Sequence, residues 1–255
     1  MFTDTHTHLY LPEFDTDLNS VVLNAKNNLV SRFLLPNIDL KTLPKLIELC
    51  KKNKSVFFPM IGLHPCSVTT NYLMQLDNIY KHFSEEKFIA IGEIGIDLYW
   101  DKTLINEQTH AFSLQIDNAK KHNLPIVIHC RNSFNEIYNV IVQKKNKLTR
   151  GVFHCFSGDY KQAKQIIELG LLLGIGGVVT FKNSKLKEIV KKIGLEHIIL
   201  ETDSPYLAPE PMRGSRNEPK YIPIIAQKIA EIKNLDISKV AEQTQLNVDN
   251  LFFNK

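Results

Sequence analysis

Eight short apolar runs alternate along the chain with segments of helical spacing, and this alternation constrains the fold more than any other feature. The runs that we expect to be strands span residues 2–7, 33–38, 56–63, 88–95, 125–130, 151–155, 171–176 and 197–202. Between two of them, Leu18, Val21, Val22, Ala25 and Leu29 form a stripe with the period of an amphipathic helix. Strands that alternate with helices in this way predict a parallel sheet of the α/β class.

Eight such units favour a closed barrel over an open, doubly wound sheet. The chain has 255 residues, and a (β/α)8 TIM-like barrel typically needs about 250. No G-x-G-x-x-G sequence follows the first run, which argues against a dinucleotide-binding fold. No linker or low-complexity tract divides the sequence, so we expect residues 1–255 to form a single barrel domain.

Composition excludes several classes of protein. No apolar run approaches the roughly 18 residues that a membrane span needs, and no leader precedes the first strand at Phe2, so we expect neither membrane insertion nor secretion. Four cysteines without a Cys-x-x-Cys pair fit a reducing cytoplasm. The net charge of +4 permits an anionic substrate but is too small for a protein that coats nucleic acid. Nothing indicates an obligate protein partner, and we expect a monomer.

Five histidines lie inside or just beyond the predicted strands: His6, His8, His64, His129 and His154. Neutral imidazole is the commonest metal ligand in proteins, and histidines from several strand ends converge only if the strands surround one point. On a strand, His6 and His8 would leave the same face and could chelate one ion. An H-x-H pair alone also arises by chance, so the interpretation depends on the other residues.

Two carboxylates complete the pattern. Glu93 lies within an apolar strand, in Gly-Glu-Ile-Gly-Ile-Asp, and Asp203 follows the eighth run, in Glu-Thr-Asp-Ser-Pro. A buried carboxylate without a counter-charge is costly, so a bound cation is expected at each. The alternative for either residue alone is an arginine partner or a role in capping a loop.

The combined set exceeds what one tetrahedral ion can use: His6, His8, Glu93, His129, His154 and Asp203. Two divalent ions are therefore the better prediction, and Zn, Mg or Mn all accept mixed histidine and carboxylate ligands. A pair of ions lowers the pKa of a shared water and stabilises the attacking and leaving oxygens of a displacement. The sequence thus predicts a metal-dependent hydrolase.

The order of the motifs resembles that of the TatD family of metal-dependent deoxyribonucleases. The matching segments, spread over the whole chain, are Thr-His-Thr-His-Leu, Gly-Leu-His-Pro, Gly-Glu-Ile-Gly-Ile-Asp, His-Cys-Arg, His-Cys-Phe-Ser-Gly and Glu-Thr-Asp-Ser-Pro-Tyr-Leu-Ala-Pro. This resemblance implies a TIM-like barrel of the amidohydrolase superfamily with two metals at its mouth. It also implies that the six residues above are the ligands and that Glu93 bridges the ions, where many superfamily members use a carbamylated lysine. Cys66 and Ser133 depart from residues that are common in the family, outside the presumed ligand set.

Three residues are expected to contact the phosphate of a DNA substrate: His64, Arg213 and Asn217. Arg213 can bind a phosphate bidentately from the loop after the eighth strand. His64 is expected at the rim, apart from the ligands, where it contacts substrate or fixes its loop. Arg131 is a weaker candidate, and the alternative for Arg213 is an ion pair with Glu210 or Glu218.

The leading hypothesis is a phosphodiesterase that degrades DNA exonucleolytically from a single-stranded or frayed end. Glu93 and Asp203 are the expected catalytic residues, with Asp203 accepting the proton of the attacking water. The alternative is a related hydrolase of a small ester, lactone or amide, because one superfamily fold hosts many reactions. A protein that only stores metal is the third hypothesis, and it leaves the phosphate-facing residues unexplained.

Overall fold

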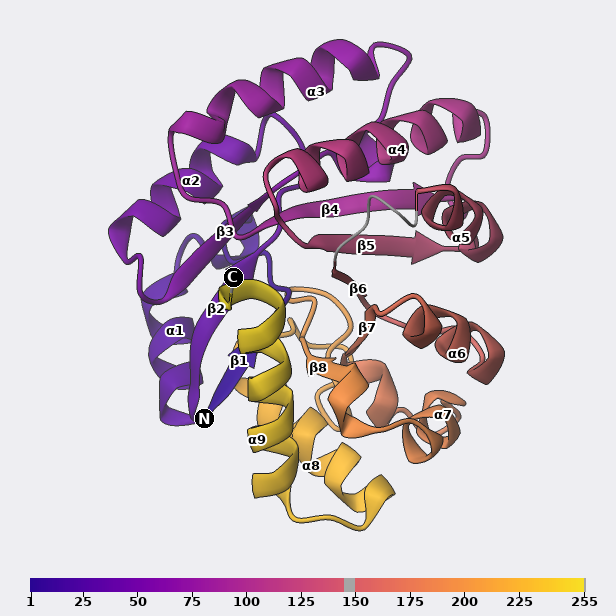
Figure 1. Cartoon of the computed structure of the whole chain (residues 1–255). Helices are drawn as coiled ribbons and strands as arrows, with labels where there is room; N and C mark the ends of the chain where they lie inside the picture. Colours follow the sequence, from indigo (N-terminus) through magenta and orange to yellow (C-terminus); the bar gives the residue numbers. More distant parts are fainter. Residues whose placement is uncertain (145–149, 255) are drawn as a thin grey trace.

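The structure is a computed structural model that describes residues 1–144 and 150–254. Its centre is one parallel sheet of eight strands in the order β1 to β8, and the helices lie around it (Figure 1). The predicted (β/α)8 barrel is confirmed. Among the helices of the described ranges, none has the length and apolar character that crossing a bilayer would require.

Each predicted run overlaps a strand; β2, β4 and β5 are shifted along the chain, and the other strands are shorter than expected. The strands are β1 (Phe2–Asp4), β2 (Val30–Leu35), β3 (Phe57–Ile61), β4 (Ala90–Asp97), β5 (Ile126–Arg131), β6 (Gly151–Phe153), β7 (Leu172–Ile175) and β8 (Ile198–Leu200). The difference in the first run bears on the site, because β1 ends at Asp4 and the two histidines of Thr-His-Thr-His lie beyond it.

The helices lie outside the strands. They are α1 (Leu18–Asn27), α2 (Leu43–Lys52), α3 (Tyr72–Tyr80), α4 (Ile105–Lys121), α5 (Phe134–Gln143), α6 (Tyr160–Glu168), α7 (Leu186–Lys192), α8 (Ile222–Lys233) and α9 (Ile237–Val248). The prediction that Leu29 belongs to the apolar face of α1 was wrong. Leu29 lies past the helix in a left-handed conformation (φ 65°) and is exposed, so it ends the turn instead of packing.

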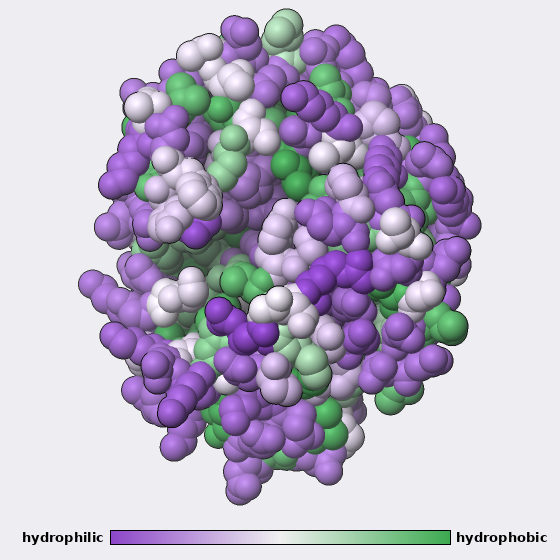
Figure 2. All heavy atoms as spheres, turned by 180° about the vertical axis from the view of Figure 1, so that it is seen from behind, coloured by the Kyte–Doolittle hydropathy of each residue, from purple (hydrophilic) through white to green (hydrophobic). Residues whose placement is uncertain are grey.

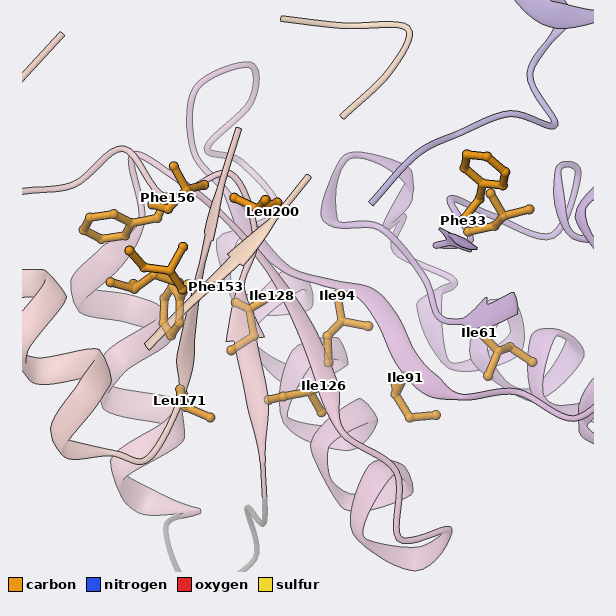
Figure 3. Packing of buried hydrophobic residues seen from close by; sticks show 14 of the residues in the cluster. Phe33, Ile61, Ile91, Ile94, Ile126, Ile128, Phe153, Phe156, Leu171 and Leu200 are labelled. Atoms are coloured by element: carbon orange, nitrogen blue, oxygen red, sulfur yellow. The ribbon is translucent and has the colours of Figure 1, made fainter. Parts of the chain in front are cut away.

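Alternate strand residues face the two sides of the barrel wall. Ile91, Ile94, Ile126 and Ile128 pack outward with Phe153 against the helices (Figure 3). A second, smaller cluster fills the inside with one residue from each of most strands: Leu34, Met60, Ala90, Val127, Val152 and Ile199. Val248, Leu251 and Phe252 of the C-terminal segment belong to this inner cluster. They close the end of the barrel where the strands begin, so polar side chains gather at the other end.

The seam between β8 and β1 is closed by side chains and single backbone bonds. Thr5 N donates to Leu200 O (3.1 Å), and Asp203 N donates to His6 O (2.9 Å). Asp4 accepts two hydrogen bonds from Thr202, one from its amide (3.0 Å) and one from its hydroxyl (2.5 Å). The seam therefore fixes the chain on both sides of the histidine pair.

A long loop follows β8 and leads to α8. Arg216 anchors it, because its guanidinium contacts the Asp17 carboxylate at 2.6 Å and that of Glu218 at 3.0 Å. Seen from behind, the molecule is hollowed near the middle of the view, and hydrophilic residues cover most of that face (Figure 2).

Candidate metal centre

The six predicted ligands meet at one end of the barrel. They form overlapping groups in which one ligand atom of each residue lies within 4.8 Å of the others. The groups are His6 with His8 and Asp203, His6 with Glu93 and His154, His64 with Glu93 and His129, and His154 with Cys155 and Glu201. Glu93 and His6 each belong to two groups, so the centre is one connected set of ligand atoms.

Glu93 lies between two sets of histidines. Its Oε2 is 3.1 Å from His6 Nε2 and 3.8 Å from His8 Nε2. Its Oε1 is 2.7 Å from His129 Nδ1 and 3.7 Å from His154 Nε2. The two oxygens of one carboxylate thus face different histidines, which is the arrangement that a bridging ligand requires.

Asp203 lies across the centre from Glu93. Its Oδ1 is 3.6 Å from His8 Nε2, 3.8 Å from His6 Nε2 and 3.8 Å from His154 Nε2. Its backbone is left-handed (φ 60°), a conformation that costs energy for a residue other than glycine and is often found at functional sites. The turn directs the carboxylate inward from the end of the seam.

Contacts on the far side of the rings fix which nitrogen of each histidine faces the centre. Tyr10 donates its hydroxyl to Pro36 O (2.6 Å), so it accepts from His8 Nδ1 at 2.9 Å. His8 Nδ1 is therefore the donor in this contact, which leaves Nε2 to face the centre. Such outer contacts orient metal-binding histidines and raise their basicity.

Carboxylates orient the rings of two further histidines, His129 and His154. Asp97 Oδ2 lies 2.8 Å from His129 Nε2, which leaves Nδ1 to face Glu93. Glu201 Oε1 lies 3.1 Å from His154 Nδ1, which leaves Nε2 to face Asp203.

Sequence reasoning assigned no role to Asp97 or Glu201. The available signal was the period of two, because Asp97 lies four residues after Glu93 on β4 and Glu201 lies two before Asp203.

Glycines make room for this arrangement at two points. A Cβ on Gly95 would lie 2.0 Å from His129 O, and the φ of Gly95 is 146°. A Cβ on Gly174 would lie 2.4 Å from Glu201 Oε2. Larger residues would displace the strand that carries His129 or the carboxylate behind His154.

The buried charges of the centre shift one another's pKa. Burial by itself would raise the pKa of Glu93, but the surrounding histidines His64, His6 and His154 hold it well below its usual range. Burial would lower the pKa of His154, yet the nearby carboxylates, first Glu201 and then Glu93, raise it to about 10. The carboxylates around His154 therefore favour its protonated form, whereas burial lowers the pKa of His6.

The donor chemistry fits divalent metal ions. Imidazole nitrogens and carboxylate oxygens are the ligands that zinc and manganese accept. His6 Nδ1 is buried without a hydrogen-bond partner in the described ranges, and its Nε2 faces Glu93.

His64 lies closer to the centre than the sequence suggested. Its Nε2 is 3.3 Å from His129 Nδ1 and 3.4 Å from Glu93 Oε1. Its Nδ1 accepts a hydrogen bond from Cys66 N (3.1 Å), so the ring also fixes the loop. The expectation that His64 stands apart from the ligands is therefore corrected.

The structure does not place Asn217 where it could bind a phosphate. Its side chain is fully buried, and its Nδ2 donates to Thr202 O (2.7 Å) and Tyr206 O (2.6 Å). Its Oδ1 accepts from Glu218 N (2.9 Å). Because these bonds use both amide hydrogens, Asn217 orders the loop.

Arg213 lies on an aromatic ring, and its role as a phosphate contact stays a prediction. Its guanidinium lies over the ring of Phe181, 4.0 Å from the centroid. The alternative ion pair is not formed within the described chain, where Glu218 instead contacts Arg216 and Lys220.

A cavity adjoins the centre between the first turns of α5 and α6. Its volume is about 380 Å³, and its lining includes Asn132, Ser133, Ser157, Gln162 and the ring of His154. Most of the accessible lining is polar, so the cavity suits a hydrated or hydrogen-bonding part of a substrate.

A model of TatD-related DNases matches residues 3–253. The chain belongs to the TatD family. It is 36% identical over 253 residues to YabD of Bacillus subtilis, an uncharacterized metal-dependent hydrolase, and the match covers 99% of both chains. YjjV of Escherichia coli, which carries the same description, is 27% identical over 98% of this chain and 97% of its own.

TatD-family structures share the whole architecture. The crystal structure of the TatD homologue YjjV superposes with a TM-score of 0.92 at 25% identity, covering 100% of this chain and 98% of that one. A TatD-family hydrolase from Entamoeba histolytica gives a TM-score of 0.89 at 24% identity, with 100% and 98% covered. The likeness spans the barrel from end to end.

Proposed function

We propose that this TatD-family chain is a metal-dependent phosphodiesterase that degrades DNA exonucleolytically from a single-stranded or frayed end. The observation that carries the proposal is the position of Glu93, whose two oxygens face different histidines. A carboxylate in this position can join two divalent cations, and paired cations are typical of enzymes that hydrolyse phosphodiesters. The family model, described as TatD-related DNase, supports the same substrate.

Residues of the chain would bind the metal ions and accept a proton around the reacting phosphate. When bound, the cations would lower the pKa of a water molecule and stabilise negative charge on the phosphate oxygens. His6, His8, Glu93, His129, His154 and Asp203 would hold them. Asp203, whose side chain is 15% exposed, is the ligand that can also take the proton of the attacking water.

The attacking water would form a new bond to phosphorus while the bond to the departing sugar oxygen breaks. His64 and Arg213 would hold non-bridging phosphate oxygens, His64 from inside the centre and Arg213 from the loop above. Arg213 has no carboxylate within ion-pair distance in the described residues, so its donors are available for a phosphate.

Zn, Mg and Mn remain the candidate ions. A chain with four free cysteines suits a reducing compartment, and we place the protein in the cytoplasm as a monomer. Gel filtration with light scattering tests the monomer, and metal analysis of freshly purified protein tests which ions it carries.

Metal-loaded protein incubated with end-labelled single-stranded DNA tests the proposal, beside a panel of small esters, lactones and amides. We expect stepwise loss of nucleotides from one end. If the protein hydrolyses the small substrates and cleaves no DNA with any of the three metals, the nuclease proposal is wrong and the protein is a small-molecule hydrolase. Absence of all turnover, with metal retained, would favour storage.

A further inference from the structure

Two of the chain's five arginines have no polar partner among the described residues. Arg32, Arg150 and Arg216 each donate to a carboxylate or a backbone carbonyl. Arg131 and Arg213 instead lie on aromatic rings; Arg131 is the last residue of β5, and Arg213 belongs to the loop after β8. An arginine whose five donors meet no acceptor is available for an anion.

Arg131 belongs to an exposed aromatic cluster. Its guanidinium carbon lies 3.8 Å from the ring centroid of Tyr99 and 5.4 Å from that of Trp100. The two rings meet edge to face with centroids 4.8 Å apart. Trp100 is 72% exposed and Tyr99 is 52% exposed, so wide aromatic surface remains in water.

This cluster is joined directly to the metal centre. Tyr99 N donates to Asp97 Oδ1 (2.9 Å), and the other oxygen of Asp97 contacts His129 Nε2 (2.8 Å). Arg131 follows His129 by two residues at the end of β5. Strands β4 and β5 lie side by side and end at the same edge (Figure 1). The exposed rings are therefore held at the rim beside Glu93 and His129.

We infer that Tyr99, Trp100 and Arg131 form a stacking platform that binds one nucleotide of single-stranded DNA next to the bond that is cleaved. The base stacks on the exposed indole, and the guanidinium of Arg131 contacts the adjoining phosphate. This inference rests on the proposed function. Stacking on an aromatic ring needs an open base face, which a single strand offers and an intact duplex does not.

Arg213 on Phe181 supplies a second phosphate contact on the far side of β6. Because β6 lies between β5 and β7 in the sheet, a strand that reaches from Arg131 to Arg213 passes His154. Stacking also explains how a chain with a net charge of only +4 holds a polyanion. A few base contacts replace the broad basic groove that backbone binding alone requires.

Trp100 is the only tryptophan of the chain, so its fluorescence reports on the platform. Metal-loaded protein carrying Asp203→Asn, which binds without turnover, is titrated with a short thymidine oligonucleotide and with an abasic strand of the same length. We expect quenching by the thymidine strand and about tenfold tighter binding of it than of the abasic strand.

Variants in the same background are compared by the anisotropy of labelled strands. Trp100→Ala should reduce the preference for the base-containing strand to near one, and Trp100→Phe should restore part of it. Arg131→Ala should lower the slope of log affinity against log salt by about one. Lys239→Ala, which removes an equal charge from an exposed position of α9, should change neither the base preference nor the salt slope.

Two outcomes would overturn the platform in different ways. If the unmutated protein cleaves DNA while the Asp203→Asn protein binds thymidine and abasic strands equally, that result contradicts the platform and leaves the proposed function standing. If the unmutated protein cleaves no DNA under any divalent metal, the proposed function and the platform both fail.

Discussion

At the scale of single residues, the two carboxylates of the centre differ in their exposure to solvent and in their proposed roles. Asp203 faces three imidazoles and is partly open to solvent, whereas Glu93 is buried between them. Asp203→Asn should therefore abolish turnover and leave a folded protein with at least one metal, because the amide cannot accept the proton of water. Single-turnover cleavage assays and metal analysis measure both effects. Near-normal rates in this variant would remove Asp203 from the mechanism.

Asp97 acts through the ring of His129. Asp97→Asn should weaken metal binding about 10- to 100-fold, because the imidazole loses the carboxylate that orients it and raises its basicity. Calorimetric titration with zinc measures the change. The matched control is Asp101→Asn, four residues later, whose carboxylate contacts only its own turn at Thr103. Equal affinities for the two variants would contradict the orienting role.

At the scale of elements, α4 uses glutamines to complete the ends of two strands. Gln115 accepts from Leu63 N (2.8 Å) and donates to Leu63 O (3.1 Å), directly before His64. Gln108 makes the same pair of bonds with Asp97 N (2.8 Å) and Asp97 O (3.2 Å). The glutamine side chains of α4 thus bond the backbone groups of Leu63 and Asp97, as a neighbouring strand would do within the sheet.

Gln115→Leu should lower the free energy of unfolding by about 2 kcal/mol, because it leaves two buried backbone groups without partners. Urea denaturation measures the difference. Gln227→Leu, at an exposed position of α8, should change stability by less than about 0.5 kcal/mol. A similar small change for Gln115→Leu would mean that water satisfies the Leu63 backbone.

The elements were predictable from sequence to different degrees. Apolar runs located all eight strands, because a barrel strand is buried on both faces and stands out from its flanks. The ends of the strands were less predictable. β1 ends at Asp4, because the residues after it form backbone hydrogen bonds with both the β2 and the β8 side of the seam. Residue type and position were enough to select six candidate ligands that the structure brings together, but the buried bonds of Asn217 depend on a loop fold that no local pattern encodes.

At the scale of the whole molecule, the centre couples metal binding to protons. Burial would lower the pKa of His129, but its contacts with Asp97 and Glu93 raise it above the usual value, and His154 behaves likewise with a pKa of about 10. A cation must displace these protons to reach the imidazole lone pairs. Apparent affinity should therefore rise with pH from 6 to 9, by up to about tenfold per unit for each proton displaced.

Zinc titrations in buffers of different ionisation enthalpy count the protons released. Release of at least one proton per bound ion at pH 7 is the expected result. A pH-independent affinity with no proton release would mean that the imidazoles are already neutral in the protein without metal.

The C-terminal segment closes the inner core with Val248, Leu251 and Phe252, and the centre needs both His6 and Asp203. During synthesis on the ribosome, the first ligands emerge when most of the barrel has yet to be translated. The inner core is completed only after residues 248–252 have left the exit tunnel. We therefore expect a nascent chain to show no catalytic activity until Phe252 has emerged from the ribosome, so that metal binding occurs late in synthesis.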